Sequence, residues 1–146
     1  MVIALEPLTS AIGPAGDRLY VPLRITGGRV CGVGSDKNIL RGDDFAIMYA
    51  DEKLMHDGRF VVEDPAGDLL VWYTGTTLAG DGAYDNMLDG QLPANAPCRV
   101  SVELISTALA WRTSVRRPLL GVGSFDGQAG RLEMTILSVT ENSGRN

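Results

Sequence analysis

The stretch Gly42–Gly75, which reads GDDFAIMYADEKLMHDGRFVVEDPAGDLLVWYTG, decides the fold because its strand-like apolar runs contain charged residues. Apolar side chains alternate over Phe45–Tyr49, which predicts a strand. A second strand is predicted to open at Asp57, and the Pro-Ala-Gly-Asp sequence at 65–68 predicts a turn into a third strand at 69–73. The stretch is therefore expected to form antiparallel hairpins.

Asp57 and Arg59 are the charged residues whose orientation matters most in this stretch. Side chains alternate between the two faces of a strand, so these two residues share one face with Val61. If that face lines a barrel interior, the pair is a polar anchor inside a pocket. If it is the outer face, the pair is an ordinary solvated contact that contributes little. The sequence leaves both interpretations open.

Outside this stretch the chain again shows short apolar alternations separated by turn residues. Gly27-Gly28 and the segment 126–130 predict hairpin turns, and the polar, glycine-rich segment 76–97 predicts a rim loop with a short helical turn over a pocket mouth. Further strands are predicted over residues 2–8, 19–26, 29–33, 99–107, 119–125 and 131–139.

These patterns predict an all-β fold. About eight antiparallel strands avoid exposed edges by closing into a barrel, and a barrel of that size can hold one small ligand. We therefore expect a single antiparallel, closed or nearly closed β-barrel, with a β-sandwich as the alternative. A chain of 146 residues with 45% hydrophobic composition suits one domain, over residues 1–140, followed by a flexible tail at 141–146.

Bulk properties exclude several classes of function. The net charge of −5 argues against nucleic-acid binding, which needs a clustered basic surface. No apolar run approaches the length of a membrane span, and Cys31 and Cys98 are far apart, which favours a reduced cytoplasmic protein. One histidine and two separated cysteines make a metal site improbable, so no metal is expected.

Several short motifs, in their order and spacing, resemble the DUF3237 family over most of the chain. They are a paired glycine before a strand, a Gly-x-Asp-aromatic step, an Asp-x-Arg-aromatic strand leading to a hydrophobic strand that ends in glycine, and a late Gly-x-Gly. The residues that match are Gly27, Gly28, Gly42, Asp44, Phe45, Asp57, Arg59, Phe60, Gly75, Gly121 and Gly123. The sequence departs from the family pattern at 110–113 and at 51–53.

The resemblance implies a lipocalin-like or allene-oxide-cyclase-like β-barrel. Some members of that family are associated with cofactor-free cyclisation or isomerisation of small organic molecules in secondary metabolism. For this chain the resemblance implies a cofactor-independent cyclase or isomerase that acts inside the barrel, for instance by closing an oxygen ring.

Carboxylates are the groups best suited to acid and base chemistry here. We expect Asp44, Asp57 and Arg59 to be the catalytic residues, with one carboxylate donating a proton while another accepts, and Arg59 or Tyr73 stabilising an enolate or phenolate oxygen. Residues expected to bind the substrate are Phe45, Trp72, Tyr73, Tyr84, Glu103 and Trp111.

Each of these interpretations has a structural alternative. An all-carboxylate metal site at Asp43 and Asp44 is conceivable, but a turn in which the two carboxylates bond their own backbone is favoured over it. Asp57 and Arg59 could form a structural ion pair, Glu103 could face solvent, and a lone histidine near a turn, such as His56, is more often exposed.

The functional prediction therefore has two branches. The first is the cyclase or isomerase, which needs no cofactor, and the second is a non-catalytic small-molecule carrier. Both branches imply a small hydrophobic organic ligand and no nucleic-acid or membrane partner. A homo-oligomer, preferably a dimer, is expected because small barrels often bury an exposed face in that way.

Overall fold

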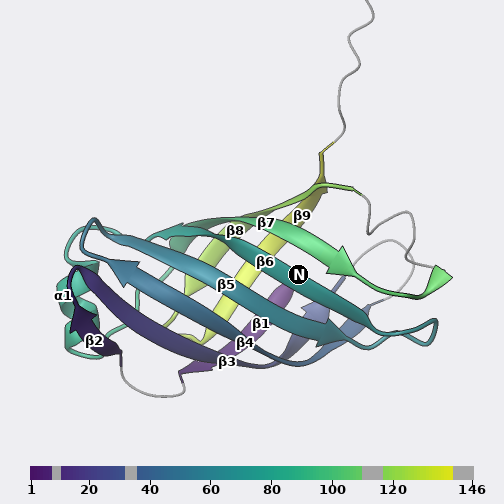
Figure 1. Cartoon of the computed structure of the whole chain (residues 1–146), viewed down its shortest axis with the longest axis horizontal. Helices are drawn as coiled ribbons and strands as arrows, with labels where there is room; N and C mark the ends of the chain where they lie inside the picture. The colour runs from purple at the N-terminus through teal and green to yellow at the C-terminus, as the bar shows by residue number, and fades with distance from the viewer. Residues whose placement is uncertain (8–10, 32–35, 110–116, 140–146) are drawn as a thin grey trace, which may run out of the picture.

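The computed structural model describes residues 1–7, 11–31, 36–109 and 117–139, and the regular secondary structure of this part of the chain is almost all strand (Figure 1). One short helix, α1, lies between β6 and β7 in the described ranges. The elements are β1 (Val2–Pro7), β2 (Ile12–Ala15), β3 (Arg18–Val30), β4 (Lys37–Tyr49), β5 (Lys53–Val62), β6 (Leu69–Leu78), α1 (Ala83–Leu88), β7 (Ala96–Ile105), β8 (Leu119–Asp126) and β9 (Arg131–Ser138).

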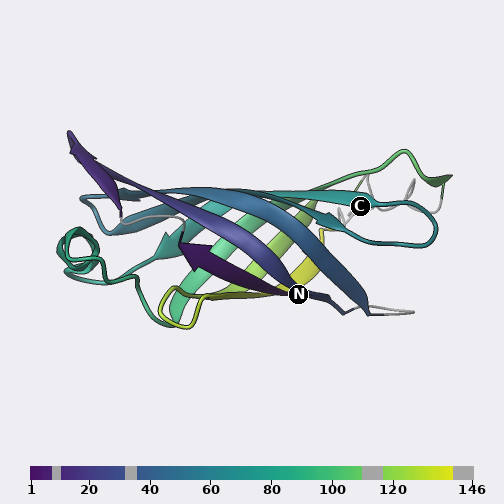
Figure 2. The ribbon, with the colours of Figure 1, turned by 90° about the horizontal axis from the view of Figure 1, so that it is seen from below.

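The strands form one antiparallel sheet that closes on itself (Figures 1 and 2). From β3 to β9, neighbours in the chain are also neighbours in the sheet. β1 closes the ring because Ile3 lies opposite Leu132 of β9 on one side and opposite Gly28 of β3 on the other. The result is a closed eight-stranded barrel, which confirms the expected fold class and excludes the sandwich. β2 pairs with the beginning of β3, beyond the stretch that β1 occupies.

Alternation along each strand decides which side chains fill the barrel. The inward residues of β3 are Leu19, Val21, Leu23 and Ile25, all almost completely buried, as their spacing predicts. The other strands contribute similar apolar side chains to one continuous core. The wall between interior and solvent is thus a single sheet, so neighbouring residues on a strand have opposite environments.

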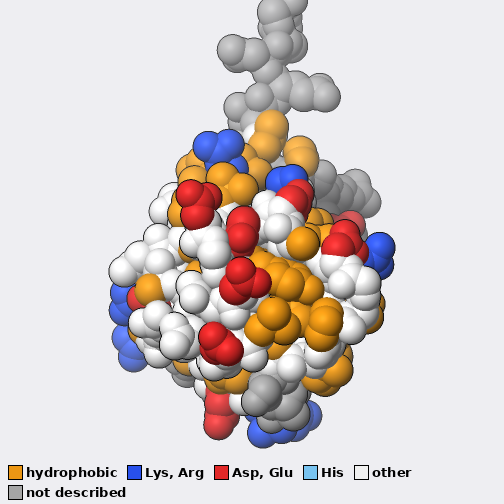
Figure 3. Space-filling view, turned by 90° about the vertical axis from the view of Figure 1, so that its left-hand side faces the viewer, with side chains coloured by type: hydrophobic (Ala, Val, Ile, Leu, Met, Phe, Trp, Pro, Cys, Tyr) orange, Lys and Arg blue, Asp and Glu red, His pale blue; other side chains and the backbone are white. Residues whose placement is uncertain are grey.

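Helix α1 lies at one end of the barrel (Figure 1). Its Ala83 and Met87 are buried and join the core. The carboxylate of Glu52, in the turn between β4 and β5, accepts the backbone N–H groups of Gly82 at 3.1 Å and Tyr84 at 2.9 Å. The segment predicted as a rim loop with a helical turn therefore closes one end of the barrel. Acidic side chains gather on this end beside a hydrophobic patch (Figure 3).

The Gly27-Gly28 hairpin prediction is wrong, because β3 continues through both glycines to Val30. The two glycines serve a close approach instead. The register between β1 and β3 shifts at this point, and a Cβ on Gly28 would lie 2.2 Å from the carbonyl oxygen of Val2. The predicted strand 29–33 is accordingly the end of β3 and not a separate strand, although residues 32–35 lie outside the described part of the chain.

In the described ranges, no helix is long and apolar enough to cross a membrane.

Candidate functional site

A carboxylate lies inside the barrel. Asp44, on β4, has no solvent exposure. Its Oδ2 lies 2.7 Å from His56 Nδ1 and accepts the Tyr73 hydroxyl at 2.9 Å, while its Oδ1 accepts the backbone N–H of Asp57 at 3.1 Å. The Tyr73 hydroxyl and the Asp57 amide both donate to this carboxyl group, which suits an ionised carboxylate, because that form can only accept hydrogen bonds.

The cross-strand register explains how these side chains meet. Gly58 of β5 lies directly opposite Asp44 of β4 on one side and opposite Tyr73 of β6 on the other. Because Gly58 has no side chain, the ring of Tyr73 passes over it to reach Asp44. A Cβ on Gly58 would lie only 2.1 Å from Cζ of Tyr73. The glycine is therefore the residue that permits the contact between β4 and β6.

His56 links Asp44 to a second polar residue inside the barrel. Its Nε2 lies 2.9 Å from the hydroxyl oxygen of Thr77, and its ring packs 5.2 Å from that of Phe125. Like Thr77, His56 is buried. With Asp44 ionised, Nδ1 carries the proton that Asp44 accepts. Asp44, His56, Tyr73 and Thr77, called here the inner network, thus form a continuous chain of hydrogen bonds across three strands.

Electrostatics keep Tyr73 protonated. Burial, and then the neighbouring Asp44 charge, raises the pKa of Tyr73 well above its usual value. The thiol of Cys98, which lies opposite Thr77 in the sheet, also has a raised pKa, mainly because it is buried, although a hydrogen bond with Thr77 opposes the shift. Tyr73 is therefore a hydrogen-bond donor at neutral pH, and Cys98 is a thiol.

The chemical capacity of the inner network is proton movement. It combines a carboxylate, an imidazole that the carboxylate orients, and a phenol that stays protonated. An imidazole held in this way can accept a proton and return it, and a neutral phenol can donate a hydrogen bond to an oxygen that becomes negative.

Asp57, Arg59 and Trp72 form a different cluster on the outer face. Trp72 Nε1–H donates to Asp57 Oδ1 at 2.8 Å, and the Arg59 guanidinium lies 3.3 Å from Asp57 and 4.8 Å from the centre of the Trp72 indole ring. The side chains of Arg59 and Asp57 are 48% and 46% exposed. The prediction that Asp57 and Arg59 share a face is confirmed, and that face is the outside.

The structure therefore separates the three predicted catalytic residues, with Asp44 inside the barrel wall and Asp57 and Arg59 outside it. The expectation that they share one interior site is not met, because Asp57 and Arg59 alternate with the inward Gly58 and Phe60. One connection remains, since the backbone N–H of Asp57 donates to Asp44 through the sheet.

The predicted substrate-binding residues are likewise divided. Tyr73 points into the barrel, whereas Phe45, Trp72 and Glu103 lie on its outer face, with Phe45 59% exposed. Tyr84 is half-buried on α1. Trp111 lies outside the described residues.

His56 and Thr77 were not predicted as site residues. The expectation that His56 is exposed is wrong, and the favoured interpretation of Asp44 as a turn residue is also wrong, since it lies within β4. The sequence contains a signal for His56. It lies an even number of residues from Leu54, Phe60 and Val62, which are apolar and buried, so it belongs to the same face of the strand. This alternation predicts that the histidine points inward.

Among the described residues, no group of three or more histidine, cysteine or acidic side chains is arranged to hold a metal ion. Cys31 and Cys98 are both free, the first exposed and the second buried.

Comparisons with known proteins agree with this fold. A family model described as a protein of unknown function, DUF3237, matches residues 1–139. A search of curated proteins gives no match. Among solved structures, a conserved protein of unknown function from Rhodopseudomonas palustris is 17% identical, with a TM-score of 0.81 over 95% of this chain and 92% of its own.

Two further solved structures extend this likeness. A protein of unknown function from Clostridium acetobutylicum is 12% identical, with a TM-score of 0.78 over 95% of this chain and 94% of its own. A structure described as an enzyme from Penicillium herquei is 14% identical, with a TM-score of 0.61 over 93% of this chain and 90% of its own. At these identities the likeness is one of fold.

Proposed function

Because the chain belongs to the DUF3237 family, which is described as a family of unknown function, we propose an activity from the residues inside the barrel. The proposed activity is the cofactor-independent cyclisation or isomerisation of a small hydrophobic or aromatic molecule. The observation that carries the proposal is the fully buried carboxylate of Asp44, bonded to His56 and Tyr73 inside an otherwise apolar barrel. Titratable groups collected in such an environment are typical of catalytic sites.

The cost of burial supports a functional origin for the inner network. Moving a charged or polar group out of water is unfavourable, and well-packed apolar side chains of similar volume are often as stable or more stable. Aliphatic side chains fill most of the core, and side chains of that kind could also fill the positions of Asp44, His56 and Tyr73. Retaining an acid, an imidazole and a phenol there is therefore better explained by chemistry than by stability.

In the proposed reaction the Asp44–His56 pair acts as the base. It removes a proton from a carbon next to a carbonyl group, or from a hydroxyl group that then closes a ring, and returns that proton elsewhere on the same molecule. Tyr73, held in its protonated form, donates a hydrogen bond to the oxygen that becomes negative. Protons are only relocated, so the reaction requires neither an oxidant nor a reductant.

A non-catalytic carrier is the second candidate. The observation that favours it is that each polar group of the inner network already has a partner, which would allow the network to be purely structural. A carrier and an isomerase need the same apolar interior, and they differ only in whether protons are exchanged with the ligand.

Deuterium exchange distinguishes the two candidates. Small cyclic and aromatic ketones are incubated with the protein in D2O, and their C–H signals are followed by proton NMR. The enzyme should catalyse deuterium incorporation into at least one ketone, and Asp44→Asn should slow it by about 100-fold or more. Asp17→Asn, which changes an exposed turn carboxylate, should exchange like the parent. Ligand line broadening without any exchange would establish a carrier and contradict the enzyme.

We also propose a cytoplasmic location and a homo-oligomer. The first rests on the two free cysteines, which are typical of a reducing compartment. The second rests on exposed hydrophobic side chains of the barrel wall, among them Tyr20, Phe45 and Met55.

A further inference from the structure

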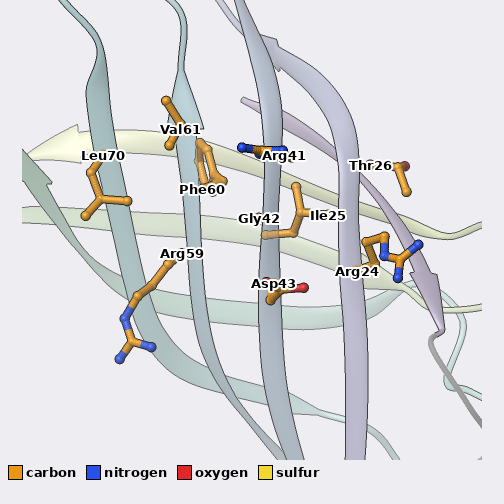
Figure 4. Close-up of a pocket in the computed structure, with 10 residues that line it drawn as sticks. All are labelled: Arg24, Ile25, Thr26, Arg41, Gly42, Asp43, Arg59, Phe60, Val61 and Leu70. Atoms are coloured by element: carbon orange, nitrogen blue, oxygen red, sulfur yellow. The ribbon is translucent and has the colours of Figure 1, made fainter.

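A second feature of the protein is a groove on the outer wall of the barrel, separate from the inner network. It runs across β3, β4, β5 and β6 and has a volume of about 610 Å³ (Figure 4). Arg24, Arg41 and Arg59 line it together with Asp43. Three arginines around one groove are notable because the chain as a whole has a net charge of −5.

Two of these arginines have no partner among the residues that the structure describes. Within the described part of the chain, Arg24 and Arg41 make neither an ion pair nor a hydrogen bond through their guanidinium groups. Arg59 is held at the rim by Asp57 and by the ring of Trp72. The Arg24 and Arg41 guanidinium groups are thus available to an external anion, whereas that of Arg59 is already paired.

The register and an irregularity of β4 create this arrangement. Asp43 lies opposite Arg24 on β3 and opposite Arg59 on β5. Between Ile39 and Gly42, β4 contains a bulge relative to β5, and Arg41 belongs to it. A bulge changes the direction in which a side chain points, and it brings Arg41 to the groove.

The remaining lining of the groove is largely apolar. Val61 and Leu70, both half-buried, extend the surface from Arg59 toward β6. Gly42 lies between the arginines without a side chain, and a Cβ there would lie 1.9 Å from the carbonyl oxygen of Arg59. The groove therefore offers an apolar surface bordered by planar cationic groups, a combination suited to an apolar molecule with one carboxylate.

We propose that this groove binds a small organic anion with an apolar body and a carboxylate group. Arg24 and Arg41 hold the carboxylate through charge-assisted hydrogen bonds, and the body rests on Val61 and Leu70. Asp43 lies among the three cations and accepts a hydrogen bond from any hydroxyl or amine donor on the ligand, while it disfavours a second negative charge at that end. The site is independent of the inner network, from which the barrel wall separates it.

Proton–nitrogen correlation NMR of the labelled protein tests this site. The probe is 1-naphthoate, and 1-naphthylmethanol is the neutral control. Saturable shifts are expected for backbone amides of residues 24–26, 41–43 and 59–61 with naphthoate, at an affinity at least about tenfold above that of the alcohol. Arg24→Gln with Arg41→Gln should lower the affinity about tenfold, since each exposed pairing contributes up to about fivefold. Arg131→Gln, which alters an arginine paired with Glu133 on β9, should leave it unchanged.

Two results would overturn the proposal. The first is equal binding of the acid and the alcohol. The second is unchanged naphthoate affinity in the double variant, and a changed sedimentation coefficient in that variant would then identify the groove as a contact between copies of the chain. Circular dichroism melts of each variant confirm that the exposed substitutions leave the fold intact.

Discussion

Asp44 lies inside the barrel although a bulkier apolar side chain, that of Phe45, follows it on β4 and is exposed. Phe45, Ile47 and Tyr49 are the bulkier alternating set on this strand, yet Asp44, Ala46 and Met48 face inward. The inward set is favourable because partners on two other strands satisfy the carboxylate, and those partners come from positions 12 to 29 residues away in the chain. Local pattern alone cannot contain that information.

Tyr73 has a pKa raised well above its usual value, and this predicts how stability depends on pH. Above about pH 10 an unfolded tyrosine loses its proton, whereas Tyr73 in the folded barrel keeps it. The unfolded state then binds fewer protons, so the free energy of unfolding falls as pH rises, by up to about 1.4 kcal/mol per pH unit. The raised pKa of Cys98 has the same effect, and it lowers the free energy of unfolding as the pH rises above the ordinary thiol pKa of 9.0.

Urea unfolding of the parent and of Tyr73→Phe at several pH values checks this expectation. At pH 8 the variant should be less stable by about 1 to 2 kcal/mol, because Asp44 loses a donor. Between pH 10 and 11 the variant should lose less stability than the parent. Parallel curves for the two proteins would show that Tyr73 ionises equally in the folded and unfolded states.

Gly58 should be intolerant of even the smallest side chain. In Gly58→Ala the added methyl group would collide with the ring of Tyr73 and displace its hydroxyl from Asp44. We expect a loss of about 1 to 3 kcal/mol, the range for overpacking a core. In the double variant Gly58→Ala/Tyr73→Phe, the loss of stability should be smaller than the sum for the two single variants, because both remove the same hydrogen bond to Asp44. Strictly additive free energies of unfolding would contradict the link between the two residues.

Arg59→Met provides a contrasting case on the outer wall. The pair with Asp57 is about half exposed, so its loss should change the free energy of unfolding by less than about 1 kcal/mol. If the pair were buried, removing Arg59 would lower the free energy of unfolding by about 3 to 5 kcal/mol. Chemical denaturation decides between these values, and the larger one would mean that the pair is shielded from water in solution, for example by a second subunit.

At the scale of elements, alternation and turn chemistry predict much of the sheet. The Asp126–Gly130 turn, the Pro65–Asp68 turn and the last two strands lie where the sequence predicts them. The Gly27-Gly28 pair fails as a turn because glycine also permits close backbone approach, and the partner in that approach, β1, is distant in sequence. Sequence pattern does not distinguish these two uses of glycine.

Helix α1 depends on Glu52 for its attachment. With six residues it is too short to be stable alone, and Glu52 accepts the N–H groups of Gly82 and Tyr84. Glu52 has a φ of 65°, so Glu52→Asn keeps a residue that tolerates this conformation but replaces the carboxylate with a shorter, neutral amide side chain. Amide exchange in α1 should accelerate about fivefold or more, while exchange in β7 stays unchanged. Unchanged exchange in α1 would show that Ala83 and Met87 alone hold the helix.

For the molecule as a whole, closure of the barrel follows from the number and length of the strands, which the sequence indicates well. The position of the inner network does not follow from these features. The alternation around Asp57 correctly groups Asp57 with Arg59 and Gly58 with Phe60, but it cannot state which group faces inward. That choice depends on pairing among β4, β5 and β6, where His56 and Tyr73 both reach Asp44.

Self-association through the outer wall is a further expectation at this scale. Tyr20 lies opposite Ile47, which lies opposite Met55, and Phe45 is 59% exposed beside them. Sedimentation velocity should show a dimer or larger assembly, and Phe45→Ser should shift it toward the monomer while leaving the circular dichroism spectrum unchanged. A monomer across the micromolar range for the parent would contradict the expectation.

We propose that the chemistry takes place on the inside of the barrel wall. The most direct measurement compares the rate of deuterium incorporation, into a ketone that the parent exchanges, for Asp44→Asn and Asp57→Asn. The two substitutions are identical in chemistry and lie on opposite faces of the same sheet. We predict that Asp44→Asn lowers the rate by about 100-fold or more and that Asp57→Asn changes it by less than about threefold. The reverse result, with the loss in Asp57→Asn, would place the reaction on the outer wall and contradict an interior site.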